Sequence, residues 1–385
     1  MKILILNLGI GGGGAERVLV DLITHWTNRA MQIGGGQSDN CINPKRDIDL
    51  FLIEKKKKDA YLPFVEQHLR KVFTFPHIFG KVRFLNKFWK RRVLNNPNLI
   101  NHFIKERYDV NLGFLEGIST IYISQKNGGK KVGYIHTSLY EMRGGKAYSK
   151  ELEAYQRLDS IICVSNYAKD SLLRLYPMLK SKDIRVIHNP IDSANILQKS
   201  ALKCAFQKRK FTFLQIGRLT YQKGLITLLE ANKILQDKGL DYDIWLLGEG
   251  DRYKKELDSM IEAQGVANVR FLGFSANPYS VIKICDCVVL ASYFEGCPLV
   301  LLESCVLKKA IISSDIPTSK EVLSDNGNLC AEFFESKNAE ALAQSMQKVI
   351  NDTAYRATLE TLSANLAKKR DISLTIKEIE SVLGV

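Results

Sequence analysis

The 385-residue sequence predicts an α/β protein with two Rossmann-like domains, whose parallel sheets face each other across a cleft. Short apolar segments of strand type alternate with helical segments along almost the whole chain, which is the pattern of βαβ units. Each half opens with an apolar strand that runs directly into a glycine-containing loop, residues 9–14 and 217–224. The length is too great for one core and suits two domains of ordinary size.

The predicted strands form two groups. Those of the first half are residues 3–8, 49–53, 71–75, 110–114, 131–135, 160–164 and 184–187, and those of the second are 211–216, 242–247, 269–272, 287–290 and 310–313. A polar segment from residue 188 to about 209 separates the groups, and we interpret it as a linker. We therefore predict one domain over 1–190 and another over 191–370. We expect the helix at 371–385 to return to the first domain.

The composition is that of a soluble globular protein, with 45% hydrophobic and 25% charged residues. No apolar run approaches the roughly 20 residues of a membrane-spanning helix. The N-terminal strand lacks the cleavage site of a signal peptide, so we expect a cytoplasmic protein. The eight cysteines are scattered without zinc-ligand spacing, and we expect most of them to be small buried hydrophobic residues in a reducing compartment.

The formal net charge of +14 indicates an anionic partner. Phosphorylated substrates and an anionic membrane surface both fit. The sequence has no helix-turn-helix, RNA-recognition or zinc-finger pattern, so we expect no nucleic-acid partner.

One segment, residues 79–92, combines an aromatic and a basic helical face. The aromatic and apolar face carries Phe84, Leu85, Phe88 and Trp89, and the basic face carries Arg83, Lys87, Lys90 and Arg91. This arrangement suits a helix lying on an anionic bilayer. An ordinary amphipathic helix packed against its own sheet is the alternative, which stays open. The nearby loop at 34–46 is longer than a connection needs, and we assign it no function.

Three features of the first half point to a ligand site. The glycine loop ends at a helix start, where free N–H groups attract anions, although a tight turn without a ligand is the alternative. Its spacing fits neither a dinucleotide fingerprint nor a Walker loop. Glu116 and His136 each follow a predicted strand, so we expect both at the same edge of the sheet, near the cleft. A purely structural histidine is the alternative.

In the second half, Arg218 and Lys223 follow the strand that opens the domain. Two cations beside a helix N-terminus suit a diphosphate whose negative charge grows as it leaves. Glu249 lies in a second glycine turn, which closes the next strand with the same geometry.

Residues 287–307 run from a strand through a loop into a helix that is apolar on nearly every side and should therefore be buried. Pro298 is expected at the first helical position. This helix carries one carboxylate, Glu303, and Glu295 lies in the loop eight positions before it. Because helical side chains lean toward the N-terminus, both can line one crevice beyond the carboxyl end of the strand. The alternative is that Glu303 pairs with a structural cation while Glu295 is a solvated loop residue.

Two Asp-x-Asp pairs, Asp47 with Asp49 and Asp241 with Asp243, resemble metal ligands. Both come just before a strand, at the end of the sheet opposite the expected cleft. We therefore predict no metal site.

Taken together, these residues resemble the retaining nucleotide-sugar glycosyltransferases of family 4, which have the GT-B fold. The resemblance rests on Gly-Gly-Ala-Glu-Arg at 13–17, Gly-Arg-Leu…Lys-Gly at 217–224, Leu-Gly-Glu-Gly at 247–250 and the E-x7-E motif formed by Glu295 and Glu303. These motifs run from the first strand to about residue 320. The resemblance implies that the first domain binds the acceptor and the second binds the donor.

The resemblance also implies roles for individual residues. Arg218 and Lys223 would hold the donor diphosphate, Glu303 the ribose hydroxyls, and Glu295 the transferred sugar. His136 would lie beside the sugar, and with Glu116 it is assigned to the acceptor side; the catalytic set is Glu295, His136, Arg218 and Lys223. Further donor contacts are implied for Gly13, Gly14, Glu249, Gly296, Cys297, Leu299 and Val300. Cys297 departs from the family, in which a larger apolar residue is common there.

We therefore expect a metal-independent retaining hexosyltransferase with no cofactor other than its nucleotide-sugar donor, UDP-linked in our prediction. Its acceptor would be a surface glycan, lipopolysaccharide or lipid-linked oligosaccharide at the inner face of the plasma membrane. The alternatives are an inverting GT-B transferase, a sugar-nucleotide epimerase, or a non-catalytic protein that binds nucleotides or glycans. An epimerase would convert the donor without an acceptor, and the anomeric configuration of the product separates retention from inversion.

Overall fold

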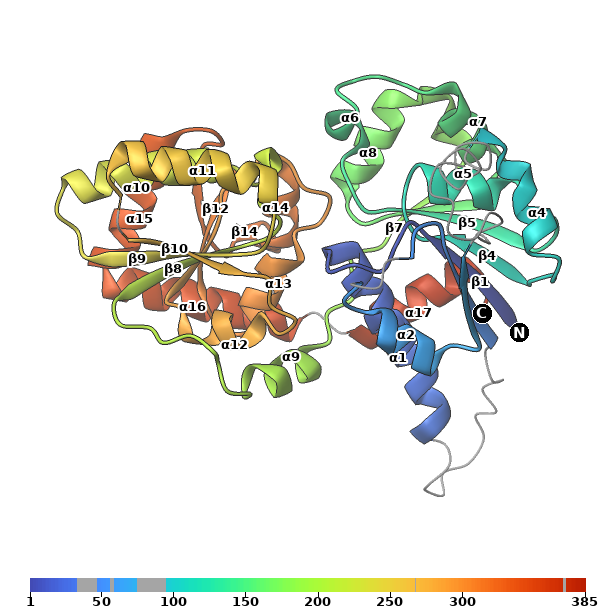
Figure 1. The fold of residues 1–385 in the computed structure, drawn as a ribbon, viewed down its shortest axis with the longest axis horizontal. Coiled ribbons are helices and arrows are strands. Elements are labelled where there is room, and N and C mark those ends of the chain that lie inside the picture. Colours follow the sequence, from blue (N-terminus) through green and yellow to red (C-terminus); the bar gives the residue numbers. More distant parts are fainter. Residues whose placement is uncertain (33–46, 56–58, 75–94, 267, 370–371) are drawn as a thin grey trace, which may run out of the picture. The chain divides into compact units, whose positions relative to one another are not determined.

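The computed structural model describes residues 1–32, 47–55, 59–74, 95–266, 268–369 and 372–385 (Figure 1). The chain divides into two compact units, which we describe one at a time. The first unit comprises Met1–Pro190 and Ser373–Val385, and the second comprises Ile191–Ile372. The predicted basic-aromatic helix at 79–92 and the whole loop at 34–46 lie outside the described residues.

The first unit is built on a seven-stranded parallel sheet with the order β3-β2-β1-β4-β5-β6-β7. The strands are β1 (Lys2–Asn7), β2 (Asp47–Leu52), β3 (Lys71–Thr74), β4 (Val110–Gly113), β5 (Lys130–Ile135), β6 (Ser160–Cys163) and β7 (Asp183–Val186). The helices are α1 (Gly14–Gln32), α2 (Leu62–His68), α4 (Ile100–Phe103), α5 (Ile118–Ser124), α6 (Leu139–Met142), α7 (Ser149–Arg157), α8 (Asn166–Leu175) and α17 (Ile372–Leu383). Helices α1, α2 and α17 cover one face, and α5, α7 and α8 cover the other (Figure 1).

The second unit has a six-stranded parallel sheet with the order β10-β9-β8-β11-β12-β15. Its strands are β8 (Phe211–Ile216), β9 (Tyr242–Leu247), β10 (Val269–Gly273), β11 (Cys287–Leu290), β12 (Ala310–Ser314) and β15 (Glu332–Phe334), and β13 (Ser324–Asp325) pairs separately with β14 (Asn328–Leu329). The helices are α9 (Ser193–Ser200), α10 (Leu225–Asp237), α11 (Asp251–Gln264), α12 (Tyr279–Ile284), α13 (Leu299–Val306), α14 (Pro317–Val322), α15 (Ala339–Asn351) and α16 (Thr353–Lys368).

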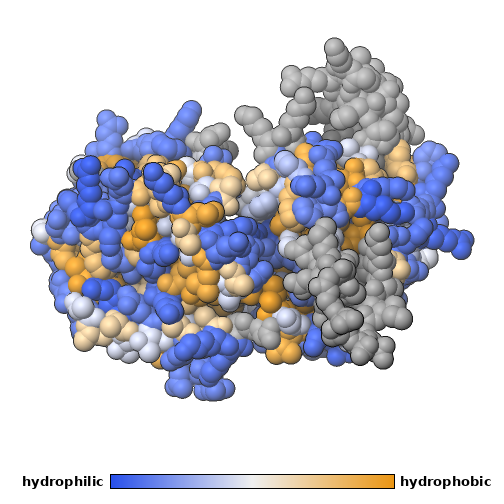
Figure 2. Space-filling model, turned by 90° about the horizontal axis from the view of Figure 1, so that it is seen from below, coloured by the Kyte–Doolittle hydropathy of each residue, from blue (hydrophilic) through white to orange (hydrophobic). Residues whose placement is uncertain are grey.

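The core of the second unit shows why its strands are mainly apolar. In β9, Ile244 and Leu246 belong to the apolar cluster beneath α10 and α15. Trp245, which lies between them, points to the opposite face and packs with α12 and α13. Successive side chains of a strand alternate between faces, so a sheet that is covered on both sides favours apolar residues on both faces of its central strand segments. Outside the core, hydrophilic residues cover much of the surface seen in Figure 2, with apolar residues between them.

The predicted fold class is confirmed. All twelve predicted strands are present, with bounds that differ by no more than two residues from the predicted ones. β15 was missed because it has three residues, of which only Phe334 is buried. Among the described helices, none combines the length and the apolar composition needed to cross a bilayer.

Candidate functional site

The main polar cluster of the second unit forms where the loops after β8 and β11 meet. These strands are neighbours in the sheet although more than 70 residues separate them in sequence. Lys223 lies in the short turn after β8 (Tyr221–Lys223), and Glu295 lies in the loop after β11. Lys223 Nζ is 2.6 Å from Glu295 Oε1. The sheet order therefore creates this ion pair.

Glu295 is held by further donors. Ser292 Oγ donates a hydrogen bond to Glu295 Oε1 at 2.7 Å. Gln222 Nε2 lies 3.2 Å from Glu295 Oε2 and also donates to the carbonyl of Phe294 at 2.8 Å. Only 9% of the Glu295 surface is exposed. Removing a carboxylate from water carries a penalty of several kcal/mol unless partners offset it, and here a cation, a hydroxyl and an amide do so.

The structure overturns the alternative that Glu295 is a solvated loop residue. Glu295 is buried and holds Lys223, whereas Glu303 is half-buried and accepts a hydrogen bond from Tyr279 OH at 3.1 Å. The sequence alone could not distinguish a buried Glu295 from a solvated one, because its partner Lys223 lies in the loop after a different strand, β8.

The helix after this loop is buried as predicted, but it begins one residue later. Pro298 caps α13 instead of forming its first residue, because its ψ of 89° is not helical. Its carbonyl accepts the N–H of Leu301 at 3.0 Å. Gly296 is buried, whereas Cys297, Leu299 and Val300 are half-buried.

Glycines bring the backbones of these loops together. Gly224 has a φ of 62°, and a Cβ built on it would lie 1.9 Å from the carbonyl oxygen of Ala291. Gly248 has a φ of 153°, and its Cβ would lie 1.9 Å from the carbonyl oxygen of Gly217. Only glycine fits such positions. The first contact fixes the loop that carries Lys223 against the end of β11, and the second fixes the start of that loop against the end of β9.

The other predicted residues of this unit lie on the surface. Arg218 is exposed and makes no hydrogen bond or ion pair within the described part of the chain. Glu249 is also exposed, and its carbonyl accepts the N–H of Leu219 at 2.8 Å. The two predicted cations therefore differ, since a carboxylate neutralises Lys223 while Arg218 is open to solvent.

In the first unit, Glu116 and His136 lie together as the sequence predicted. They follow the adjacent strands β4 and β5, and the backbone N–H of His136 donates to Glu116 Oε2 at 2.9 Å. The imidazole stacks on the ring of Tyr134, with a centroid distance of 4.4 Å. Both imidazole nitrogens are shielded from solvent and have no hydrogen-bond partner within the described residues. Burial lowers the pKa of His136 to about 3, so the ring is neutral at pH 7.

The surroundings of Glu116 include two residues that sequence reasoning missed. Burial raises the pKa of the Glu116 carboxyl, while the nearby Arg143 guanidinium opposes this effect. Arg143 pairs with Glu151, which also accepts a hydrogen bond from Tyr176 OH at 3.0 Å. Glu151 lies in α7 among charged residues typical of a solvated helix. It becomes buried only when α7 packs against α5.

The glycine loop before α1 differs from a simple anion-binding loop, because a carboxylate of the protein lies at the helix start. Gly13 immediately precedes the helix and Gly14 begins it. A Cβ on Gly13 would lie 2.3 Å from Glu16 Oε2, so this carboxylate lies beside the helix start. Carboxylates are favourable at this position because of the helix dipole. Glu16 therefore reduces the attraction of this site for an external anion.

The two Asp-x-Asp pairs have other partners. Asp49 is fully buried and accepts hydrogen bonds from Arg70 Nε at 2.8 Å and Tyr108 OH at 2.6 Å. Asp241 pairs with Lys210 at 2.6 Å on the surface. Within the described ranges, no three His, Cys, Asp or Glu side chains gather in a group that could hold a metal ion.

Two family models match the chain. The model described as Glycosyltransferase Family 4 matches residues 46–195, and the model described as Glycosyl transferases group 1 matches residues 199–366. Together these matches span most of both units.

Relatives from several organisms are similar to the chain. A Campylobacter jejuni enzyme, GalNAc-alpha-(1->4)-GalNAc-alpha-(1->3)-diNAcBac-PP-undecaprenol alpha-1,4-N-acetyl-D-galactosaminyltransferase, is 24% identical, over 99% of this chain and 96% of its own length. Another C. jejuni transferase, which also acts on a diphospho-undecaprenol substrate, is 30% identical over 60% of this chain and 61% of its own. An uncharacterised glycosyltransferase of Methanocaldococcus jannaschii is 30% identical, but the match covers 46% of this chain and only 44% of that protein.

Solved structures share the fold. The Anabaena protein HepE, in complex with UDP and glucose, has a TM-score of 0.75 at 20% identity, with 100% of this chain and 99% of that chain covered. Sucrose-phosphate synthase of Thermosynechococcus elongatus has a TM-score of 0.72 at 14% identity, with 99% and 98% covered.

Proposed function

Because the chain belongs to the GT-B glycosyltransferases of family 4, we propose that it transfers a sugar from a UDP-sugar to a glycan or lipid-linked acceptor with retention of configuration. The Lys223–Glu295 pair is the observation that carries this proposal. It places a desolvated cation and a carboxylate at the carboxyl ends of adjacent parallel strands, where ligands of such sheets bind. Arg218 adds a second, open cation on the same loop.

In the proposed reaction, the bond between C1 of the sugar and the diphosphate oxygen breaks. A bond from C1 to the acceptor hydroxyl oxygen forms on the same face, and the hydroxyl proton passes to the departing diphosphate. Lys223 and Arg218 would balance the charge that grows on this leaving group. The diphosphate would share Lys223 with Glu295, which leaves the carboxylate close to the sugar. We further propose that these cations serve in place of a metal ion.

The remaining family roles stay proposals. Glu303 would bind the ribose hydroxyls, and its hydrogen bond from Tyr279 would orient the carboxylate for that purpose. His136 would lie beside the transferred sugar, with neutral nitrogens able to bind a hydroxyl.

The names of the C. jejuni relatives favour a diphospho-undecaprenol-linked oligosaccharide among the possible acceptors. Such an acceptor would place the enzyme in the cytoplasm, on the inner face of the plasma membrane. The net charge of +14 suits an anionic membrane surface. Co-sedimentation with liposomes tests this part, and binding that is indifferent to anionic lipid would contradict it.

Thermal unfolding with UDP, GDP, ADP and their sugars tests the donor site. A ligand at about 100 times its dissociation constant adds about 2.7 kcal/mol of stability, which raises Tm by a few degrees in a protein of this size. We expect this shift with a UDP ligand in wild type and in Lys208→Ala, whose lysine pairs with Asp286 on the surface. Lys223→Ala should lose it. If no nucleotide moves the transition, the donor site is wrong.

Incubation with the responsive nucleotide sugar then separates the enzymatic alternatives. Release of the nucleoside diphosphate only when an acceptor is present supports a transferase, whereas conversion of the sugar without an acceptor supports an epimerase. The anomeric proton of the product, followed by NMR, distinguishes retention from inversion. Binding without any turnover would favour a non-catalytic protein.

A further inference from the structure

The second unit contains a cavity of about 360 Å³ far from the loops that carry Lys223 and Glu295. Its lining consists of five residues: Ala205, Phe206, Gln207, Arg209 and Arg270. Arg270 is the second residue of β10, and Arg209 lies two residues before β8. Both therefore lie near the amino ends of strands, whereas the donor loops follow the carboxyl ends. The cavity belongs to neither candidate site described above.

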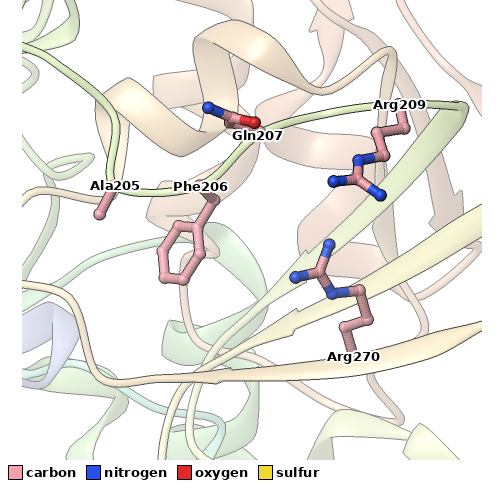
Figure 3. Close-up of a pocket in the computed structure, with 5 residues that line it drawn as sticks. All are labelled: Ala205, Phe206, Gln207, Arg209 and Arg270. Carbon is pink, nitrogen blue, oxygen red and sulfur yellow. The ribbon is translucent and has the colours of Figure 1, made fainter.

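Two cations face each other across this cavity. The guanidinium groups of Arg209 and Arg270 point toward one another, and the ring of Phe206 borders the same space (Figure 3). No acidic residue is part of the lining. Both guanidinium groups are exposed, so water screens their mutual repulsion, and an anion between them would turn it into attraction on both sides.

The two lysines next to Arg209 in sequence are both paired with carboxylates, whereas the arginines are not in the part of the chain that the structure describes. Lys208 pairs with Asp286 and Lys210 with Asp241, each at 2.6 Å. Arg209, between them in sequence, has no ion pair within the described residues, and neither has Arg270. The carboxylates of this region thus neutralise the lysines and leave both arginines open.

The walls of the cavity are held in place by a buried tryptophan. Arg270 pairs in register with Trp245 on β9, and its guanidinium lies 5.7 Å from the centroid of the indole. The ring of Phe206 packs on the same indole, with a centroid distance of 6.2 Å. Trp245 itself is fully buried. One arginine and the aromatic wall are therefore positioned by the core.

We propose that this cavity is a second anion-binding site, which takes a phosphate or diphosphate group between Arg209 and Arg270. Guanidinium groups bind phosphate oxygens through paired charge-assisted hydrogen bonds. The volume lies within the range of small-molecule sites and exceeds the needs of a single phosphate. The organic part of the ligand packs against Phe206. The phosphate is carried either by a free metabolite or by a lipid head group.

Isothermal titration of the full chain with inorganic diphosphate tests the site. The variants are R209Q, R270Q and R209Q/R270Q, with K208Q as the matched control because it removes the same charge from a paired side chain. R218Q removes the open cation of the donor loop. We expect each single arginine variant to weaken diphosphate binding at this cavity by roughly tenfold, and the double variant to abolish it. K208Q and R218Q should retain diphosphate binding at the cavity.

Sedimentation with vesicles of phosphatidylcholine containing phosphatidic acid distinguishes the two sources of phosphate. Loss of diphosphate binding in R209Q/R270Q with unchanged vesicle binding assigns a free phosphorylated ligand, and loss of both assigns a lipid head group. Loss of vesicle binding alone assigns a lipid head group. If R209Q/R270Q matches K208Q in both experiments, the site does not exist. Both arginines are exposed, so the variants should keep the wild-type unfolding midpoint, and urea unfolding verifies this.

Discussion

The two candidate sites follow adjacent parallel strands in their own sheets, but they satisfy their polar groups in opposite ways. In the second unit, Glu295 is saturated by Lys223, Ser292 and Gln222. In the first unit, both imidazole nitrogens of His136 are shielded from solvent without a partner in the described chain. A ligand at Glu295 would have to compete with internal partners, whereas a ligand that reached His136 would supply hydrogen bonds that the fold leaves unmade.

The largest expected effect comes from breaking the saturated site. Lys223→Met should lower turnover by about 100-fold or more, because the growing charge of the leaving group loses a positioned cation. It should also lower the free energy of unfolding by about 3 kcal/mol, because Glu295 remains buried without its cation. Steady-state kinetics and urea unfolding measure the two effects.

Two further variants separate these effects. Lys208→Met, at a more exposed ion pair, should change stability by less than about 1 kcal/mol. The double variant Lys223→Met/Glu295→Gln should regain stability without regaining activity. If the single variant is as stable as wild type, Glu295 is not held in the way we describe.

The next largest effect comes from replacing the glycines that support the backbone of each site, and the loss of stability should differ between the two sites. Gly224→Ala places a Cβ 1.9 Å from a carbonyl oxygen and should cost about 3 kcal/mol of unfolding free energy. Gly117→Ala in the first unit, with a φ of 75°, would place its Cβ 3.2 Å from Nη2 of Arg143, a side-chain atom that has to shift by only a few tenths of an ångström. It should cost about 2 kcal/mol, because a φ of 75° combined with a ψ of −120° is a backbone conformation that only glycine adopts readily.

Gly239→Ala is the control for backbone strain alone, since its φ is 74° and nothing lies within 4 Å of the added Cβ. Urea midpoints of the three variants should place Gly224→Ala well below the other two. Equal midpoints would show that the loop of Lys223 is not held by close backbone contact.

The pH dependence of the unfolding free energy tests whether His136 in the first unit is buried and neutral. The folded pKa of His136, about 3, lies below its usual value of 6.5, so the unfolded chain takes up a proton first as the pH falls. Wild type therefore loses unfolding free energy between pH 6.5 and pH 3, by about 1.4 kcal/mol per pH unit at the steepest. His136→Phe should flatten this part of the curve. Identical curves would contradict a buried neutral imidazole.

Glu116 should act in the opposite direction. Its pKa is raised by burial, so the folded state favours the protonated carboxyl. Stability is lost as the pH rises from the usual value near 4.5 through the folded pKa. Glu116→Gln keeps an acceptor for the His136 N–H and removes this loss, so its stability relative to wild type should be higher at neutral pH than at acid pH. Urea unfolding across the pH range measures it.

The smallest effect concerns Glu303. Tyr279→Phe removes one hydrogen bond to this carboxylate, so nucleotide affinity should fall by about fivefold, or about 1 kcal/mol. Tyr355→Phe is the control, because its hydroxyl bonds to Glu332 near α15. It should lower stability and leave affinity unchanged. If both variants bind the nucleotide with the same affinity, Glu303 does not contact the nucleotide.

The sequence predicted the scaffold well and the partners of the site poorly. Strands such as β9 were evident because burial on both faces favours a run of apolar residues, here Ile244–Leu247. Glu116 and His136 were correctly placed at the same edge of the sheet, because residues that follow adjacent parallel strands leave the sheet at one edge. Lys223 and Glu295 were both identified, but the ion pair between them was not. Arg143 and Glu151 were missed, because the many charged residues of α7 are typical of a solvated helix.

What the sequence determined by itself is therefore the order of strands and helices and the positions at which polar residues leave the sheets. These depend on local periodicity and on the glycine and proline pattern, which each segment carries within itself. Only the tertiary structure decided that Lys223 neutralises Glu295 while Arg218, Arg209 and Arg270 stay open. Ion pairing depends on strand order and on loop backbones packed through Gly224 and Gly248, and such distances between remote segments arise only when the chain folds.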